Sequence, residues 1–331
     1  MDGPGPYAGP TKVLVDSEAE IKAAIDRYKQ LGYEQIKVYS SMRPELVPFI
    51  TRYSHENGLR VSGHVPAFMI AEEAIRQGYD EIQHMNFLFL NFMPDVRDTR
   101  TPARFTAVAE RGADLDLQSA AVRSFVDLMK TKGIVSDPTL IVFEGLFTSH
   151  PGEISPDKAE IANRFPPQVR RGFLTGGLPI PEGKDERYLA SFHRMLDFAK
   201  LLYDSGVTIV GGTDGMPGFD LARELELYVD AGIPAPKVLQ IATLGAARVM
   251  KHDGQVGSIE PGKLADLVII DGDPTVNIHD LRNVVTVIKD GNVFDSREVQ
   301  RAIGMVPRLM TPGRKTHSGT GAGTGPLGRL P

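Results

Sequence analysis

The sequence predicts an α/β protein in which parallel strands alternate with helices, followed by a small antiparallel β unit. Two observations predict this class. Short apolar runs alternate with stretches whose apolar side chains recur every three or four positions, and glycines stand where those stretches end. After residue 257 the helical stretches give way to strands joined by a tight turn. Strands that alternate with helices need crossover connections, which join parallel strands.

The first part of the chain holds three helix–strand repeats. Ser17 is expected to cap a helix over residues 17–31, because Ile21, Ile25 and Tyr28 recur at helical spacing and Gly32 ends the pattern. The other expected elements are strands over 35–39, 60–65 and 81–85 and helices over 44–57 and 71–77. Each repeat is long enough for one crossover, so we expect these strands to lie parallel.

The middle of the chain is less regular. We expect helices over 115–132, 188–205, 221–231 and 236–250, and strands over 134–140 and 207–214. Residues 145–187 contain many prolines and glycines. A long insertion of this kind in a compact domain is usually a lid or a binding loop, so we expect it to help select the substrate.

The C-terminal part predicts a small β domain. Residues 264–270, 284–289 and 293–294 are expected strands, and Asp290-Gly291 predicts a hairpin turn because both residues tolerate positive φ. We therefore divide the chain into a loop over 1–10, an α/β portion over 11–256, a small β domain over 257–310 and a tail over 311–331. The tail is rich in glycine, threonine and proline, so we expect it to be disordered.

The composition is that of an ordinary globular protein, with 331 residues of which 41% are hydrophobic and 24% charged. The formal net charge of −5 disfavours nucleic-acid binding, which needs a basic face. Because the chain has no cysteine, disulfides, thiol nucleophiles and iron–sulfur clusters are excluded. No apolar run is long enough for a membrane span. No targeting segment is visible, but an N-terminal truncation would remove one, so the location stays open with the cytoplasm as the default expectation.

Four polar residues stand in or just after predicted strands: Lys37, His64, His84 and Asp214. Because the carboxyl ends of the strands of an α/β barrel meet at one face, we expect these side chains to converge there. Two imidazoles and a carboxylate are a common ligand set for zinc or a similar divalent ion. Structural roles are the alternative: a histidine can be a hydrogen-bonded core residue, an aspartate before glycine can form a turn, and a lysine can extend to solvent.

Several short motifs make the chain resemble the amidohydrolase superfamily, in particular its imidazolonepropionase-like and metal-dependent prolidase-like branch. They are Gln-Ile-Lys-Val-Tyr (35–39), Gly-His-Val-Pro (63–66), Glu-Ile-Gln-His-Met (81–85), Gly-Thr-Asp (212–214), Ala-Thr-Leu-Gly-Ala-Ala-Arg (242–248) and the segment 257–268. The resemblance extends over roughly residues 11–296 of the sequence. The resemblance implies a (β/α)₈ barrel of the TIM type with a small β-sandwich beside it, and a hydrolase that uses divalent metal ions, zinc above all.

The resemblance also implies a role for each of the four residues. Lys37 matches the strand-four lysine that is carbamylated (a carboxylated lysine) and bridges two metal ions. His64 and His84 match the histidines of strands five and six, which hold the second ion. Asp214 matches the strand-eight aspartate that binds the first ion and acts as general base and then acid. Tyr39 could donate a hydrogen bond to the substrate, although packing inside the barrel is its simpler role.

The implied reaction is hydrolysis of a C–N bond by metal-activated water. An amide, a cyclic amide, a peptide with C-terminal proline and another acyl amino acid are all open as substrates, so the expected partner is a small or peptide-like molecule.

The chain departs from the family pattern in one respect. The first metal ion of the family also needs a His-x-His pair on strand one, and this sequence contains no His-x-His. If Lys37 lies on strand four, strands one to three are missing, so we expect an N-terminally truncated amidohydrolase with strands four to eight of the barrel. An open sheet edge favours self-association, so we expect a homo-oligomer or poor solubility.

Two expectations for activity follow from the missing pair. We expect this chain to hold at most one metal ion and to show little hydrolase activity. The alternative function is that of an inactive fragment or pseudoenzyme that acts as a binding or structural partner.

Overall fold

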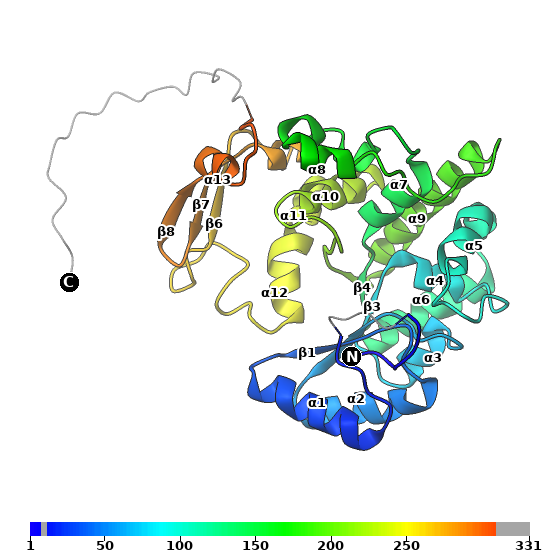
Figure 1. Cartoon of the computed structure of the whole chain (residues 1–331). Helices are drawn as coiled ribbons and strands as arrows, with labels where there is room; N and C mark the ends of the chain where they lie inside the picture. Colours follow the sequence, from blue (N-terminus) through cyan, green and yellow to red (C-terminus); the bar gives the residue numbers. More distant parts are fainter. Residues whose placement is uncertain (8–11, 309–331) are drawn as a thin grey trace, which may run out of the picture.

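The computed structural model describes residues 1–7 and 12–308 (Figure 1). Within these residues, five parallel strands are interleaved with helices, and three antiparallel strands follow near the C-terminus. The expected α/β class with parallel strands is therefore confirmed. The expected tail over 311–331 and part of the expected N-terminal loop lie outside the described residues.

The parallel strands form two hydrogen-bonded groups. Strand β1 (Gln35–Val38) pairs with β2 (Arg60–Gly63). Strand β4 (Val135–Asp137) lies between β3 (Glu81–Gln83) and β5 (Thr208–Ile209) and pairs with both. Asp80 joins the two groups, because its backbone N–H donates to Val61 O at 2.9 Å and its carbonyl oxygen accepts from the Val135 N–H at 2.9 Å.

The two faces of these strands differ in polarity. Ile36, Val38, Val61 and Ile82 are at most 2% exposed and belong to the hydrophobic core. Side chains alternate along a strand, so Lys37 lies on the face opposite Ile36 and Val38. The other polar residues of that opposite face are Gln35, Arg60, Ser62, Glu81 and Gln83. They are hydrogen-bonded to one another, with the Arg60 guanidinium 2.9 Å from Gln35 Oε1 and 3.2 Å from Glu81 Oε2.

Helices flank the strands and extend the molecule beyond them (Figure 1). The first begins after Ser17, whose Oγ accepts from the Glu20 N–H at 3.3 Å, as its predicted capping role requires. No helix of the described part of the chain is long and apolar enough to span a membrane. The helices are α1 (Glu18–Gln30), α2 (Val47–Glu56), α3 (Ala71–Arg76), α4 (Met85–Leu90), α5 (Ala103–Arg111), α6 (Ala120–Lys132), α7 (Leu140–Thr148), α8 (Pro167–Gly172), α9 (Asp185–Ser205), α10 (Asp220–Asp230), α11 (Ala235–Gln240), α12 (Ala246–Val249) and α13 (Ser296–Ala302).

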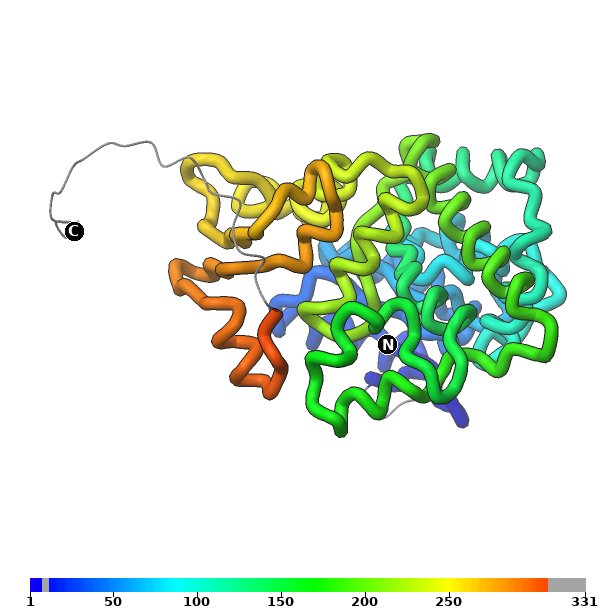
Figure 2. Tube along the Cα trace, turned by 90° about the horizontal axis from the view of Figure 1, so that it is seen from above, coloured from blue at the N-terminus to red at the C-terminus, as the bar shows by residue number. Residues whose placement is uncertain are grey.

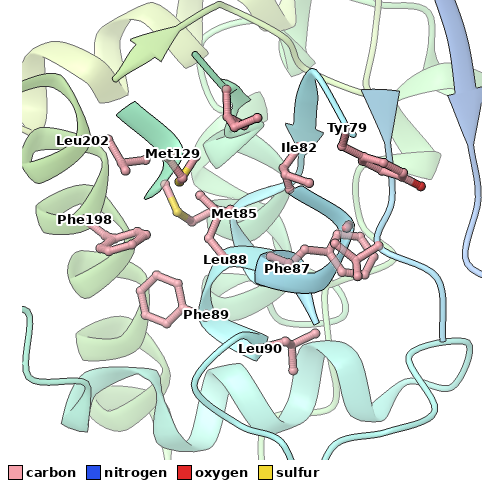
Figure 3. Packing of buried hydrophobic residues seen from close by; sticks show 14 of the residues in the cluster. Tyr79, Ile82, Met85, Phe87, Leu88, Phe89, Leu90, Met129, Phe198 and Leu202 are labelled. Atoms are coloured by element: carbon pink, nitrogen blue, oxygen red, sulfur yellow. The ribbon is translucent and has the colours of Figure 1, made fainter. Parts of the chain in front are cut away.

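Helix α4 corrects the expected strand over 81–85. The strand ends at Gln83, His84 adopts a φ of 68°, and Met85 begins a helix whose six side chains are all buried. A helix that is buried on all sides has no polar face, so its segment shows no amphipathic period. Figure 3 shows this helix in the core, where the ring of Phe89 lies 5.6 Å from the ring of Phe198 on α9.

Other predicted bounds are also wrong. Helix α6 begins after its cap Ser119 rather than at Leu115, and the strand expected over 134–140 ends at Asp137 because Leu140 already belongs to α7. The insertion over 145–187 contains the end of α7, short 3₁₀ turns, α8 and the start of α9. The helix expected over 236–250 is interrupted by a π-helical turn, Ile241–Gly245. Helices α4, α5, α7, α8 and α13 were not expected from the sequence.

The C-terminal unit is an antiparallel sheet, shown beside the α/β part in Figure 2. Strand β7 (Val284–Lys289) lies between β6 (Leu267–Ile270) and β8 (Asn292–Asp295). The predicted hairpin is confirmed: β7 and β8 are joined through Asp290 and Gly291, whose φ angles are 51° and 74°. The division into domains and the barrel and sandwich closures stay predictions.

Candidate functional site

The four residues singled out in the sequence lie at or near the carboxyl ends of parallel strands. Lys37 is in β1, on the face turned away from the core side chains of Ile36 and Val38. His64 directly follows β2, and His84 directly follows β3. Asp214 lies five residues beyond the end of β5.

Two of these residues are in contact across the gap between the strand groups. The ring centroids of His64 and His84 are 4.7 Å apart, although the strands before them belong to different hydrogen-bonded groups. His84 Nε2 lies 3.8 Å from Asp214 Oδ2. The structure therefore brings three of the four residues together directly, and the charge of Lys37 acts on both imidazoles.

His64 is held in a defined orientation. Its Nδ1 lies 2.9 Å from Ser40 Oγ, and its ring lies 4.5 Å from the ring of Tyr39. The side chain is only 6% exposed. Burial lowers the pKa of His64 well below its ordinary value, and the nearby His84 and the Arg104 charge lower it further. The imidazole is therefore neutral at pH 7.

His84 is held in the same manner, through a different hydroxyl. Its Nδ1 lies 2.8 Å from Thr139 Oγ1, while its buried Nε2 has no hydrogen-bond partner among the described residues. Burial lowers the pKa of His84 to about 3, and the positive charges of Lys37 and Arg104 act in the same direction. A neutral, buried and unpaired ring nitrogen is unusual unless a ligand completes it.

Thr139 precedes a helix start that a buried glutamate side chain holds. Glu224 of α10 accepts hydrogen bonds from the backbone N–H groups of Leu140 at 2.9 Å and Ile141 at 2.8 Å, which form the first turn of α7. Thr139 immediately precedes this turn, with a φ of 47°. The carboxyl group of Glu224 therefore fixes the start of α7, and with it the hydroxyl that holds His84.

The donor set fits a divalent cation. Two neutral imidazoles whose Nδ1 atoms are held by hydroxyl groups present the arrangement usual for histidine ligands, in which a partner on one ring nitrogen orients the other toward the ion. Within residues 1–7 and 12–308, however, no group of three or more His, Cys, Asp or Glu side chains is arranged to hold a metal ion. A third ligand beside the two imidazoles can also come from a residue of another type, such as Lys37.

Among the described residues Lys37 forms no ion pair with a carboxylate, and its charge acts on the two imidazoles. Its Nζ is 5.0 Å from the centre of the Tyr39 ring. Its positive charge lowers the pKa values of both histidines and of Asp137. The lysine is thus close enough to the histidines to act on them electrostatically.

Asp137, the last residue of β4, was not singled out from the sequence. Its Oδ1 is buried and has no partner among the described residues. Burial raises its pKa to about 7, the negative charges of Glu81 and Asp214 act in the same direction, and Lys37 opposes them. A polar residue at the end of an apolar strand is the signal that drew attention to His84, and it was available here too.

Arg104 is a second residue that sequence reasoning missed. It lies on α5, and its Nη1 donates to Ser40 Oγ and to Thr99 O, each at 3.3 Å. Its charge lowers the pKa values of His64 and His84. No signal in the sequence could have placed it there, because α5 itself was not expected.

Part of the chain matches a known protein family. Residues 157–294 match the Amidohydrolase family. An imidazolonepropionase from Caldanaerobacter subterraneus subsp. tengcongensis is 32% identical over 99 residues, which are 28% of this chain and 24% of that protein. These matches support membership of the amidohydrolase superfamily. The predicted family is therefore confirmed, and the expected truncation stays a prediction.

Solved amidohydrolase-like structures share the fold. A Xaa-Pro dipeptidase with bound methionine in its active site has a TM-score of 0.55 and 23% identity, covering 89% of this chain and 63% of that chain. A bottromycin amidohydrolase has a TM-score of 0.62 and 22% identity, covering 92% of this chain and 67% of that chain. The likeness shows a TIM-barrel-like α/β fold. The chain spans less than two thirds of the length of the dipeptidase.

Proposed function

We propose that this chain carries part of the active site of a metal-dependent amidohydrolase that hydrolyses a C–N bond. The observation that carries the proposal is the buried Nε2 of His84, which has no partner among the described residues and lies beside His64 and Asp214. The resemblance to an imidazolonepropionase and a Xaa-Pro dipeptidase supports the class of bond. An amide, a cyclic amide and an Xaa-Pro or other acyl amino acid bond remain the substrate classes considered.

The residues proposed to hold metal are His64, His84, Lys37 as a carbamate, and Asp214. Zinc is the expected ion, since imidazole and carboxylate ligands suit it. When bound, a divalent ion of this kind supplies an activated water and polarises the carbonyl oxygen of the substrate. The low pKa values of both histidines favour this role, because an imidazole must be unprotonated to bind a cation.

The chain's own residues then supply proton transfer and orientation. The Asp214 side chain is 55% exposed, so one of its oxygens can reach the attacking water, accept its proton and later pass that proton to the leaving nitrogen. Tyr39, whose ring lies 4.5 Å from the His64 ring, is proposed to donate a hydrogen bond from its hydroxyl to the substrate. Ser40 and Thr139 hold the two imidazoles throughout the reaction.

The alternative function is a binding or structural partner without turnover. The observation that favours it is the lack of any His-x-His in the sequence, since the resemblance implies that such a pair holds the first metal ion. With either function, hydrolase or binding partner, we expect this chain alone to hold at most one metal ion.

Metal analysis and hydrolysis assays test the proposal together. The full chain is loaded with zinc, dialysed and analysed for metal content, and then screened against N-acyl amino acids, Xaa-Pro dipeptides and cyclic amides. His84→Ala should lose the bound zinc, whereas His55→Ala should keep it, because His55 is half-exposed and contacts Asp80 instead. Asp214→Asn should keep the ion held by His64 and His84 but lose turnover.

The results separate the two functions. Zinc retained equally by wild type and His84→Ala would contradict the metal site. Zinc lost in His84→Ala without any hydrolysis by the wild type would favour the binding function. Two tightly held ions with turnover abolished in Asp214→Asn would show that the site is complete without a His-x-His pair.

A further inference from the structure

A cavity of about 590 Å³ lies between the small C-terminal sheet and the α/β part of the molecule. Its walls are mainly apolar and come from both parts: Ile161 and Phe219 on one side, and Val287, Phe294, Val299 and Ile303 on the other. None of the four candidate site residues lines it, so it is separate from the candidate functional site. A hollow of this size with apolar walls and few polar groups is typical of a site for a small molecule.

Several apolar side chains of these walls are exposed to solvent. Phe294 is 44% exposed, Val299 46% and Ile303 53%. Leaving such apolar surface in water costs free energy, and an exposed apolar cluster around a cavity favours a bound ligand.

The two sides of the cavity are held together by the protein itself. The Val306 N–H donates to Arg164 O at 2.8 Å, and Arg164 Nε donates back to Val306 O at 3.1 Å. These bonds fasten the segment after α13 to the 3₁₀ turn Ala162–Arg164. The cavity is therefore formed before any ligand enters.

The charged side chains that line the cavity are all basic: Arg164, Arg282, Lys289 and Arg308. Three of them form ion pairs with carboxylates of the described chain, whereas Arg164 does not. Arg164 Nη2 donates to Gln300 Oε1 at 2.7 Å, and both this acceptor and Val306 O are neutral. Burial lowers the pKa of Arg164, and the charge of Arg308 lowers it further. An anion beside Arg164 would offset both effects.

We propose that this cavity binds a small amphipathic carboxylate, such as a medium-chain fatty acid, with its head group on Arg164 and its apolar chain against Phe294 and Ile303. Arg164 Nη1 has no partner among the described residues, so it is available to the head group. One cation without a carboxylate partner suits a ligand with a single negative charge. The inference is independent of the proposed function, because it requires neither metal nor hydrolysis.

Calorimetric titration of the full chain tests the two parts of the ligand separately. Octanoate is compared with octanamide, which has the same chain and a neutral head, and with hexanoate, which is two methylenes shorter. Octanoate should bind about 10- to 100-fold more tightly than octanamide, as expected for hydrogen bonds to a charged group. It should bind about tenfold more tightly than hexanoate, because each buried methylene adds to affinity.

Two variants assign these preferences to residues. Arg164→Met keeps an apolar stem without the charge, so it should bind octanoate and octanamide equally well while keeping the affinity of wild type for octanamide. Phe294→Ala should weaken both ligands alike, and it should fold normally because Phe294 is 44% exposed.

The matched control is Arg297→Met. Arg297 lies on α13 like Val299 and Ile303, but it does not line the cavity, and its guanidinium lies 3.4 Å from Asp295. Its removal should leave both preferences unchanged.

Four results would overturn the inference. A wild type that does not bind octanoate would show that the cavity is closed to small ligands, by the segment after Arg308 or by another part of the protein. A wild type that binds octanoate and octanamide equally, or an Arg164→Met variant that still prefers octanoate, would remove the role of the guanidinium. Octanoate binding that weakens as the protein concentration rises would assign the cavity to an interface between copies of the chain.

Discussion

Protonation of His84 should make the metal-stripped protein sensitive to acid. Its side chain is 7% exposed, and burial lowers its pKa to about 3 from an ordinary value of 6.5. Because the folded protein binds this proton less readily than the unfolded chain, the contribution of the neutral imidazole to stability is complete above pH 6.5. It is lost as the pH falls toward 3. The difference between the two pKa values corresponds to about 5 kcal/mol of unfolding free energy.

The change that isolates this contribution is His84→Gln, studied in the presence of a chelator. Unfolding free energies from urea titrations are compared between wild type and variant at several values between pH 7 and pH 4. The advantage of the wild type over the variant should shrink by about 1.4 kcal/mol per pH unit below 6.5, or about 3 kcal/mol by pH 4. Other titrating groups are common to both proteins, so most of their effect cancels in the difference.

The control for this measurement is His55→Gln. The His55 side chain is 44% exposed, and its Nε2 lies 2.9 Å from Asp80 Oδ2. An exposed pair of this kind contributes about 1 kcal/mol at most, so its difference from the wild type should vary little with pH. A His84→Gln difference that stays constant from pH 7 to pH 4 would refute the reasoning, since it would mean that solvent reaches the imidazole freely.

Three other substitutions test the packing around the site. Thr139→Val removes the hydroxyl that holds His84 Nδ1 and should weaken zinc binding by about 10- to 100-fold, measured by competition with a chelating dye. Gly212→Ala would place a Cβ 2.1 Å from Asp137 Oδ1, so it should displace that carboxylate and lower the melting temperature, as scanning calorimetry would show. Phe198→Ala empties a fully buried position and should lower the unfolding free energy by about 3–5 kcal/mol, whereas Leu189→Ala on the exposed side of the same helix should cost about 1 kcal/mol or less.

The parts of the fold that could be predicted from the sequence are those with a strong local signal. Ser17 caps α1 because its hydroxyl satisfies a free N–H, and Asp290-Gly291 forms a hairpin because both residues accept positive φ. Helix α4 could not be predicted, because burial on every side removes the polar face that marks a helix in a sequence. Tertiary packing decided the structure there.

The candidate site likewise contains residues that the sequence predicted and residues that it did not. His64 and His84 follow strands directly, so a sequence pattern could point to them, and the structure brings their rings to 4.7 Å. Arg104 contacts Ser40 although the two residues are 64 positions apart in the sequence, because it lies on α5, a helix that was not predicted. Whether these residues bind metal or substrate stays a prediction that the binding experiments address.

The backbone itself distinguishes this edge of the sheet from the rest of the molecule. Among the described residues, six that are not glycine adopt positive φ, and three of them lie near the ends of successive parallel strands: His84 after β3, Thr139 after β4 and Asp214 after β5. Such a conformation costs about 1–3 kcal/mol per residue and persists only where the surrounding structure imposes it. His84 Nδ1 is hydrogen-bonded to Thr139 Oγ1, and His84 Nε2 lies 3.8 Å from Asp214 Oδ2. These three unfavourable backbone conformations surround the buried Nε2 of His84, which has no partner among the described residues. Packing of the core does not require them, so they support a function for this edge of the sheet independently of any relative.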